Sequence, residues 1–292
     1  MTTILKTSTF KPENVQFSPL KKNKRGGGAV YMNYLNKKTS ETHAIYIQTP
    51  KMYCPFGASA YKKEDSNEVP KYSLQLSFKE DDGMVQELKG KFQGLDAFIV
   101  KEVLKNKEWQ STLGLGRSKL TADMVSMLHS TIVKEPKKPE YPSTVNVKLP
   151  VKFGTEEFQT NVYGKDKQKV ELSYENIEQV IPARCEVRAL LQVSAVWLIG
   201  NKLGVTIRAS QLVVYPSDTL SGYSFMDSDD DEDETEAKND ESSDSEQSEA
   251  EEEVPEPVVE VSEPVAEEVS DPIVEKKKAK KVRKPKVKKV VK

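Results

Sequence analysis

Aromatic and basic residues are interleaved along the chain between residues 31 and 72. Flat rings stack on nucleic-acid bases of any identity, for about 1–3 kcal/mol each, while lysine and arginine contact the phosphates. Proteins that bind single-stranded DNA combine these two residue types. Proteins that recognise double-stranded DNA instead use a recognition helix or zinc fingers, and the sequence shows neither pattern. The rings expected to stack on bases are Tyr31, Tyr34, Tyr46, Tyr53 and Phe56. The cations expected to contact phosphates are Lys51, Arg117, Lys119, Lys148, Lys152 and Arg208.

The same aromatic residues have a second interpretation as core residues. About half of the rings on a strand face the core, and alternation alone does not say which face is which. Tyr72 shares its face with Leu74 and Leu76, so we assign it to the core. Trp197, within the apolar residues 193–198, is assigned to the core as well.

Motifs for catalysis or metal binding are weak. The two histidines, His43 and His129, have no catalytic motif around them and are expected to be structural. The two cysteines, Cys54 and Cys185, are expected to be reduced and packed, because no metal-binding spacing surrounds them. We therefore predict a protein that is not an enzyme and that needs no cofactor or metal.

Residues 114–119 (GLGRSK) bear a slight likeness to a phosphate-binding loop. They lack the Gly-Lys-Ser/Thr order, and no buried strand precedes them, so nucleotide hydrolysis is not expected. Arg117 and Lys119 keep a milder role, since cations near a helix start can contact a nucleic-acid phosphate.

The C-terminal tail carries two opposed blocks of charge. Residues 227–275 contain 23 carboxylates and one lysine, for a net charge of −22, and residues 276–292 contain 11 lysines and arginines and no acid. Because the whole chain is −2, residues 1–226 carry +9. Blocks of like charge repel, stay disordered and commonly act as interaction tails. We predict a disordered acidic tract at 227–253, a Pro/Val/Glu spacer at 254–275 and a Lys-rich basic tail at 276–292.

Several roles are open for this tail. Ser228, Ser243 and Ser248 each have an acid three residues on, a setting for acidophilic kinases, and phosphorylation would deepen the negative charge. The basic residues 276–284 fit a nuclear-localisation signal, a second DNA contact or a clamp on the acidic tract, and we rank these equally. The acidic tract also fits a protein of another class, a histone-chaperone-like or scaffold protein that binds basic partners.

The elements that must position these residues are mostly strands. Residues 29–35 and 42–48 predict a hairpin, residues 51–59 a third strand at an edge or bulge because of Pro55, and residues 71–79 the clearest strand. Further strands are expected at 143–153, 158–163, 170–174, 185–199 and 203–215, the last two joined by a turn at Gly200-Asn201.

Two helices are expected between the two groups of strands. Apolar residues recur every three or four positions from 84 to 104, with Asp81 or Asp82 as the N-cap. A second helix fits 121–133 with Thr121 as N-cap. The pattern predicts a mainly β protein, with a small antiparallel barrel or sandwich over residues 29–226 and a helical insertion at about 82–133. Residues 1–28 are expected to form a flexible basic arm, for which a solvated loop and a phosphate-gripping arm fit equally well.

Several short motifs, taken in order, resemble one protein family. They are residues 75–78 (QLSF), Trp109, 141–150 (YPSTVNVKLP), 196–197 (VW) and 202–206 (KLGVT). The chain resembles the single-stranded-DNA-binding proteins of nucleocytoplasmic large DNA viruses, which are similar to the podophage replication type. The resemblance spans about residues 31–215.

This resemblance implies an OB-fold that coats single-stranded DNA, without catalysis, during viral replication, recombination or repair. It also implies that an acidic tail mimics DNA, competes for the binding groove and docks replication proteins such as the polymerase and helicase-primase. The lysine-rich end departs from that family pattern. The sequence leaves monomer and homodimer open, and it contains no membrane-spanning run or signal-peptide core. We expect an intracellular protein, in the host cytoplasm at virus factories or in the nucleus.

Overall fold

Five strands close into a barrel at the centre of the protein. The structure is a computed structural model that describes residues 3–24, 26–62, 70–115, 120–152 and 154–217. The barrel strands are β5 (Glu41–Cys54), β7 (Lys71–Ser77), β10 (Thr144–Leu149), β13 (Cys185–Ile199) and β14 (Lys202–Tyr215). They pair in the ring order β5–β7–β10–β14–β13–β5, and β10–β14 is the one parallel pair of this ring. A five-stranded, partly open barrel of this kind is the OB-fold.

Further strands extend the barrel into one large mixed sheet. The strand β4 (Gly28–Asn36) pairs with both β5 and β13, and β4 and β5 form the expected hairpin. The remaining strands are β1 (Ile4–Lys6), β2 (Val15–Phe17), β3 (Lys21–Lys22), β6 (Ala58–Tyr61), β8 (His129–Ser130), β9 (Val133–Lys134), β11 (Asn161–Tyr163) and β12 (Lys169–Val170). The mainly β class is confirmed, but β1, β8 and β11 join their neighbours in parallel, so the sheet is not purely antiparallel.

Residues 3–24 are part of this fold, which corrects the expectation of a flexible arm. Strand β1 pairs with β5, and β2 and β3 pair with β4. Two 3-10 turns, η1 (Thr7–Thr9) and η2 (Pro12–Asn14), connect β1 to β2. The backbone hydrogen bonds that strand pairing supplies fix this segment, which the polar composition alone did not reveal.

The expected strand at 51–59 is divided in the structure. Residues 51–54 continue β5 past a register shift against β13, and β6 begins at Ala58. Between them Gly57 has φ +67°, and a Cβ there would lie 2.5 Å from the carbonyl oxygen of Ile181. The chain therefore turns at a position that only glycine fills without strain.

The helical insertion consists of α1 (Gly83–Lys105), α2 (Lys107–Thr112) and α3 (Ala122–Leu128). Helix α1 has the predicted periodicity, and its apolar face is buried at Leu88, Phe92, Leu95, Ile99 and Val103. The second helix begins after Thr121 as predicted but ends at Leu128, because residues 129–130 and 133–134 pair with β14 and β10 instead. A fourth short helix, α4 (Ile177–Val180), lies before β13.

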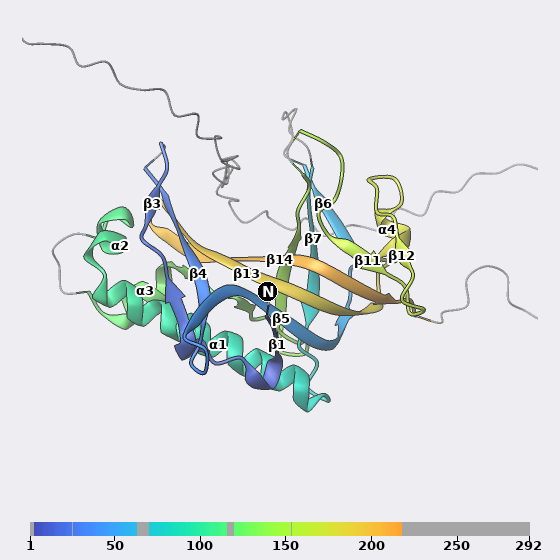
Figure 1. Cartoon of the computed structure of the whole chain (residues 1–292), viewed down its shortest axis with the longest axis horizontal. Coiled ribbons are helices and arrows are strands. Elements are labelled where there is room, and N and C mark those ends of the chain that lie inside the picture. The colour runs from blue at the N-terminus through green and yellow to red at the C-terminus, as the bar shows by residue number, and fades with distance from the viewer. Residues whose placement is uncertain (1–2, 25, 63–69, 116–119, 153, 218–292) are drawn as a thin grey trace, which may run out of the picture. The chain divides into compact units, whose positions relative to one another are not determined.

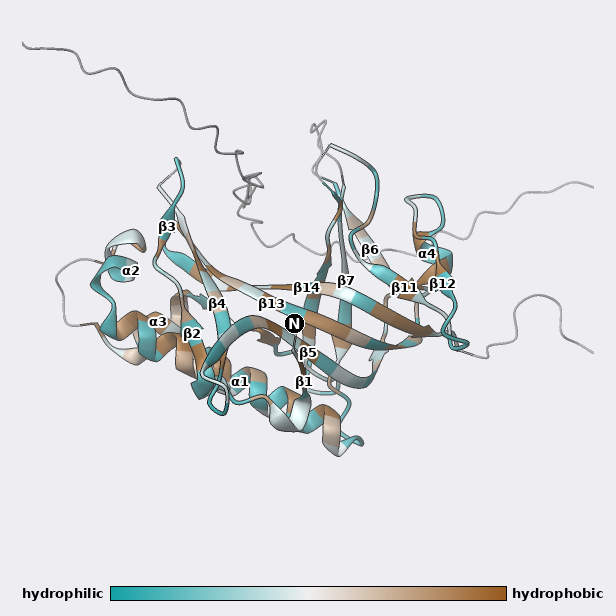
Figure 2. Ribbon diagram, in the orientation of Figure 1, coloured by the Kyte–Doolittle hydropathy of each residue, from teal (hydrophilic) through white to brown (hydrophobic). Residues whose placement is uncertain are grey.

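The helices and two hairpins lie on opposite sides of the long strands. Figure 1 shows α1 along one side of β13 and β14, and the β3–β4 and β6–β7 hairpins standing on the other side at their two ends. Hydrophobic and hydrophilic residues alternate along β13 and β14 (Figure 2), as strands with one face toward a core require. Tyr72 lies in that core, 7% exposed and stacked on Tyr174 with ring centroids 5.2 Å apart, as predicted.

Candidate nucleic-acid interface

A row of polar side chains crosses four strands on the outside of the barrel. Arg208 of β14 is opposite Lys148 of β10 on one side and Gln192 of β13 on the other. Gln192 is in turn opposite Tyr46 of β5. Their side chains point outward, because their sequence neighbours are buried in the barrel. Three residues of the predicted set, Tyr46, Lys148 and Arg208, are thus brought into one row.

Another row of the same surface begins on β4. Tyr31 is opposite Ala195 of β13, which is opposite Thr206 of β14. Lys21 of β3 lies over the Tyr31 ring, with its Nζ 4.9 Å from the ring centroid.

This surface faces away from the helices. Residues alternate sides along a strand, and Lys22, next to Lys21, contacts Glu108 of α2 at 3.8 Å. Lys21 and Tyr31 therefore lie on the opposite side of β4 from α2. We call this surface the outer face, and it consists of Lys21, Tyr31, Tyr46, Lys148, Trp197 and Arg208.

Trp197 belongs to the outer face, which corrects its assignment to the core. Its neighbours Val196 and Leu198 are fully buried, but Trp197 is half-buried on the other side of β13, opposite Gly204. The sequence held a signal for this placement. A two-residue turn at Gly200-Asn201 fixes the hairpin register, which puts Trp197 beside a glycine and not among the buried leucines.

Two other predicted site residues, Lys51 and Tyr53, lie near the C-terminal end of β5. Tyr53 is opposite Glu186 of β13, and the Nζ of Lys79 lies 4.0 Å from the centroid of the Tyr53 ring. Lys51 forms an ion pair with Glu186 and lies over the Tyr215 ring, 4.7 Å from its centroid. Lys51 therefore already pairs with a carboxylate, and its role as a phosphate contact stays a prediction.

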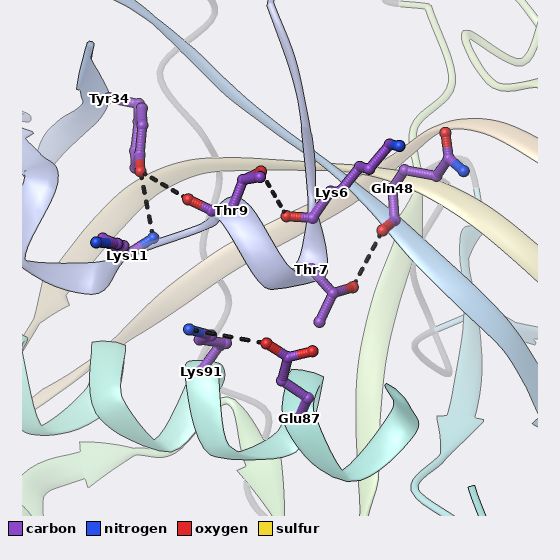
Figure 3. Close-up of polar contacts among 8 residues, drawn as sticks. All are labelled: Lys6, Thr7, Thr9, Lys11, Tyr34, Gln48, Glu87 and Lys91. Atoms are coloured by element: carbon purple, nitrogen blue, oxygen red, sulfur yellow. Dashed lines mark hydrogen bonds and ion pairs between the residues drawn. The ribbon is translucent and has the colours of Figure 1, made fainter. Parts of the chain in front are cut away.

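Tyr34 is a core residue, which corrects its assignment as a stacking ring. It is 8% exposed, and its ring packs 5.9 Å from that of Phe10. Its hydroxyl accepts a hydrogen bond from the Lys11 backbone N–H at 3.3 Å and donates to the Thr9 carbonyl at 3.2 Å (Figure 3). A third bond joins it to the Asn14 amide at 3.2 Å. No ring face is left for a base, since the N-terminal segment covers this side of β4.

The remaining predicted residues lie at the margins or outside the described residues. Phe56 is 66% exposed at the start of the β5–β7 connection, one of the two OB-fold loops that contact oligonucleotides. Lys152 is exposed, with its Nζ 3.5 Å from a Glu157 carboxylate oxygen. Outside the described residues lie Arg117, Lys119, Ser228, Ser243, Ser248 and the whole predicted tail from 227 to 292.

Charge is distributed unevenly over the sheet. The strands that the structure describes contain 11 lysines and arginines but only two carboxylates, Glu41 and Glu186. Residues 1–226 contain 23 carboxylates, so the acids lie almost entirely outside these strands. Strands disfavour glutamate and lysine to a similar degree, so β-propensity does not explain a bias of one sign. An excess of cations on the strands favours the approach of anions to the sheet.

Asp96 and His129 form a buried pair between α1 and β8. Burial raises the pKa of Asp96 to about 7 and lowers the pKa of His129 to about 4. An Asp96 carboxylate oxygen lies 3.3 Å from His129 Nε2, which has no other partner among the described residues. The two pKa directions favour a neutral pair whose proton resides on Asp96. The other carboxylate oxygen accepts the Ile132 N–H at 2.9 Å, so Asp96 links α1 both to His129 and to the backbone after β8.

Cys54 and Cys185 are opposite one another on β5 and β13, both buried and free. A thiol–thiol hydrogen bond and burial raise the pKa of Cys185.

Across the residues that the structure describes, no cluster of three potential metal-ligating side chains is found. In that same part of the chain, none of the helices has the length and apolar character needed to span a membrane.

Comparison with known proteins gives one family match and several distant structural likenesses. Residues 10–254 match the family described as "Protein of unknown function (DUF2738)". No curated protein matches the chain. The single-stranded DNA-binding protein from bacteriophage Enc34 is 16% identical, with 74% of this chain and 98% of that chain covered and a TM-score of 0.35. The single-stranded DNA-binding protein gp2.5 of bacteriophage T7 is 8% identical, with coverages of 61% and 98% and a TM-score of 0.37.

Proposed function

This chain belongs to the DUF2738 family of proteins of unknown function, and we propose that it binds single-stranded DNA without sequence preference. The observation that carries the proposal is the outer face, where aromatic rings and cations lie together on strands almost free of carboxylates. In this proposal Tyr31 and Tyr46 stack on bases while Lys148 and Arg208 contact phosphates. Stacking on any base and contact with any phosphate give affinity without reading a sequence.

The barrel topology supports the same proposal. OB-folds bind oligonucleotides across the face of their second and third strands and between two loops, the first–second and the fourth–fifth strand connections. In this chain those strands are β7 and β10, and Lys148 is opposite Ser73 of β7. The two loops are the β5–β7 connection, which contains the exposed Phe56, and the Gly200-Asn201 turn next to Trp197.

We also propose that the acidic tract 227–253 competes with DNA for the outer face and docks replication proteins. The charges of −22 for residues 227–275 and +9 for residues 1–226 support an attraction between the two parts. Strand β14 ends at Tyr215, and the eleven residues before Asp227 can span at most about 40 Å. Coating of single strands during viral replication, recombination or repair is the corresponding role.

Fluorescence anisotropy of a labelled oligo-dT tests the proposed function. The full chain is expected to bind oligo-dT more tightly than a duplex of the same length. Its affinity is expected to fall with salt at a slope of about −0.7 per phosphate contacted. An affinity independent of salt, or a preference for the duplex, would contradict the proposal.

A paired substitution locates the binding surface. Replacing Lys148 and Arg208 together by glutamine is expected to lower the affinity and to reduce the salt slope by about 1.4, the share of two phosphate contacts. Lys169→Gln, on β12 at the end of the strand order, removes one positive charge and serves as the control; it is expected to change neither. Equal losses in the control and in the paired variant would mean that general charge, not this surface, holds the DNA.

A further inference from the structure

Trp197 lies against the backbone of the neighbouring strand at Gly204. A Cβ atom at Gly204 would be 2.4 Å from Cζ2, 2.8 Å from Cε2 and 3.1 Å from Nε1 of the indole. Real Cβ atoms essentially never approach other atoms below 3.0 Å. The indole therefore occupies the space that any other side chain at position 204 would need.

The glycine is required by the ring and not by the backbone. Gly204 does not have a positive φ, so its strand conformation is open to every residue type. Within a strand, glycine weakens the sheet and commonly marks a place where another group approaches closely. Here the approaching group is the Trp197 side chain.

Shielding of a strand glycine by an aromatic ring is the simplest interpretation of this contact. Shielding of Gly204 alone does not account for the partial exposure of Trp197 or for its separation from other aromatic rings. Trp109, the other tryptophan, is 2% exposed and meets Phe17 edge-on at 5.3 Å, whereas Trp197 is half-buried. Among the described residues, Trp197 makes no contact with another aromatic ring.

The neighbours of Trp197 on the outer face are the groups that a bound strand needs. Ala29 is opposite Trp197 and Tyr31 is opposite Ala195, so the two aromatic side chains are diagonal neighbours on β4 and β13, about 7–8 Å apart. Small residues, Ala195 and Thr206, lie between them and Arg208. Arg208 follows Gly204 by four residues along β14, about 13 Å away.

We propose that Trp197 is a base-stacking residue of the outer face and that Gly204 is the residue that positions it. This inference rests on the proposed function and adds a specific subsite to it. The indole is seated against Gly204, and its uncovered part takes a base beside Tyr31. Every base has a flat face, so the subsite accepts any nucleotide.

Tryptophan fluorescence tests the subsite directly in the full chain. In Trp109→Phe, Trp197 is the sole tryptophan, and its emission is expected to be quenched as oligo-dT binds. Anisotropy of a labelled oligo-dT, measured on the same samples, should give the same binding curve. Binding seen by anisotropy with no change in Trp197 emission would overturn the subsite and leave the proposed function standing. No binding by anisotropy would overturn both.

Two substitutions test the roles of the ring and of the glycine. Trp197→Ala is expected to weaken oligo-dT binding by about 5- to 100-fold, the range of one base–aromatic stack, and Trp197→Phe is expected to recover most of the loss. Gly204→Ala, in the Trp109→Phe background, is expected to shift the Trp197 emission and to weaken binding. Thermal unfolding of each variant identifies those that fold. Folded Trp197→Ala or Gly204→Ala variants with unchanged oligo-dT affinity would overturn the assignment.

Discussion

At the scale of single residues, the pair Asp96–His129 has opposing effects on stability. The folded-state pKa of His129 is depressed to about 4, so its contribution is present above its ordinary pKa of 6.5 and is lost as the pH falls toward 4. The folded-state pKa of Asp96 is raised from 3.8 to about 7, so its contribution is present below 3.8 and is lost as the pH rises toward 7. Lys134 is the nearby charge that acts on both groups. Over the window from pH 4 to 6.5 the two contributions largely cancel.

Asp96→Asn is expected to reveal the pH dependence of stability that His129 contributes. The amide oxygen of asparagine can still accept the Ile132 N–H, but it does not take up a proton. The free energy of unfolding of Asp96→Asn should therefore fall, relative to the unsubstituted protein, by about 2–3 kcal/mol between pH 6.5 and pH 4. Urea unfolding at a series of pH values measures this. Addition of His129→Gln should remove the extra pH dependence, and identical pH profiles for Asp96→Asn and the unsubstituted protein would contradict the neutral-pair assignment.

At the scale of elements, the start of α1 is set by one carboxylate. The Asp82 side chain accepts hydrogen bonds from the backbone N–H groups of Met84 at 2.8 Å and Val85 at 3.3 Å. The sequence admitted Asp81 or Asp82 as the cap, and the structure assigns Asp82. Helix α1 packs against β5 of the barrel and carries Asp96.

Asp82→Ala is expected to lower the free energy of unfolding by about 1 kcal/mol, because two N–H groups lose their acceptor. Asp81→Ala, its neighbour, removes a similar charge but no cap and is expected to change stability by less than about 0.5 kcal/mol. Chemical denaturation of both variants makes the comparison. An equal loss for both would show that the general charge near the helix start matters and the cap does not.

At the scale of the whole molecule, the tail reverses the net charge of the chain. Residues 1–226 carry +9, whereas the full chain carries −2. If the acidic tract competes with DNA, a chain ending at Met226 should bind oligo-dT more tightly than the full chain at low salt. The difference should shrink as salt rises, because screening weakens both attractions.

A second truncation serves as the control for this comparison. Removal of residues 276–292 alone keeps the acidic tract and removes 11 positive charges, so it should not raise the affinity. Equal affinities for the full chain and for residues 1–226 would show that the tract does not compete. Failure of both to bind DNA would favour the histone-chaperone-like or scaffold alternative.

The sequence by itself determined the features that depend on local pattern. Alternation predicted β7 and β10, the three-to-four-residue period predicted α1, and the glycine-asparagine turn predicted the β13–β14 hairpin, because each of these signals lies within a short stretch of the chain. The interleaving of aromatic rings and cations between residues 31 and 72 indicated a nucleic-acid-binding surface. The charge of the tail implied a net charge of +9 for residues 1–226. These are properties of neighbours along the chain.

Only the tertiary structure decided which side each ring faces and which charges are paired. Tyr31 and Tyr34 are three residues apart and look alike in sequence, yet Tyr34 is buried because residues 9–14 fold over it. Lys51 meets Glu186 and Trp197 meets Gly204 across strand pairs. These contacts depend on register and closure between segments far apart in the chain, which a period of two or 3.6 residues does not encode.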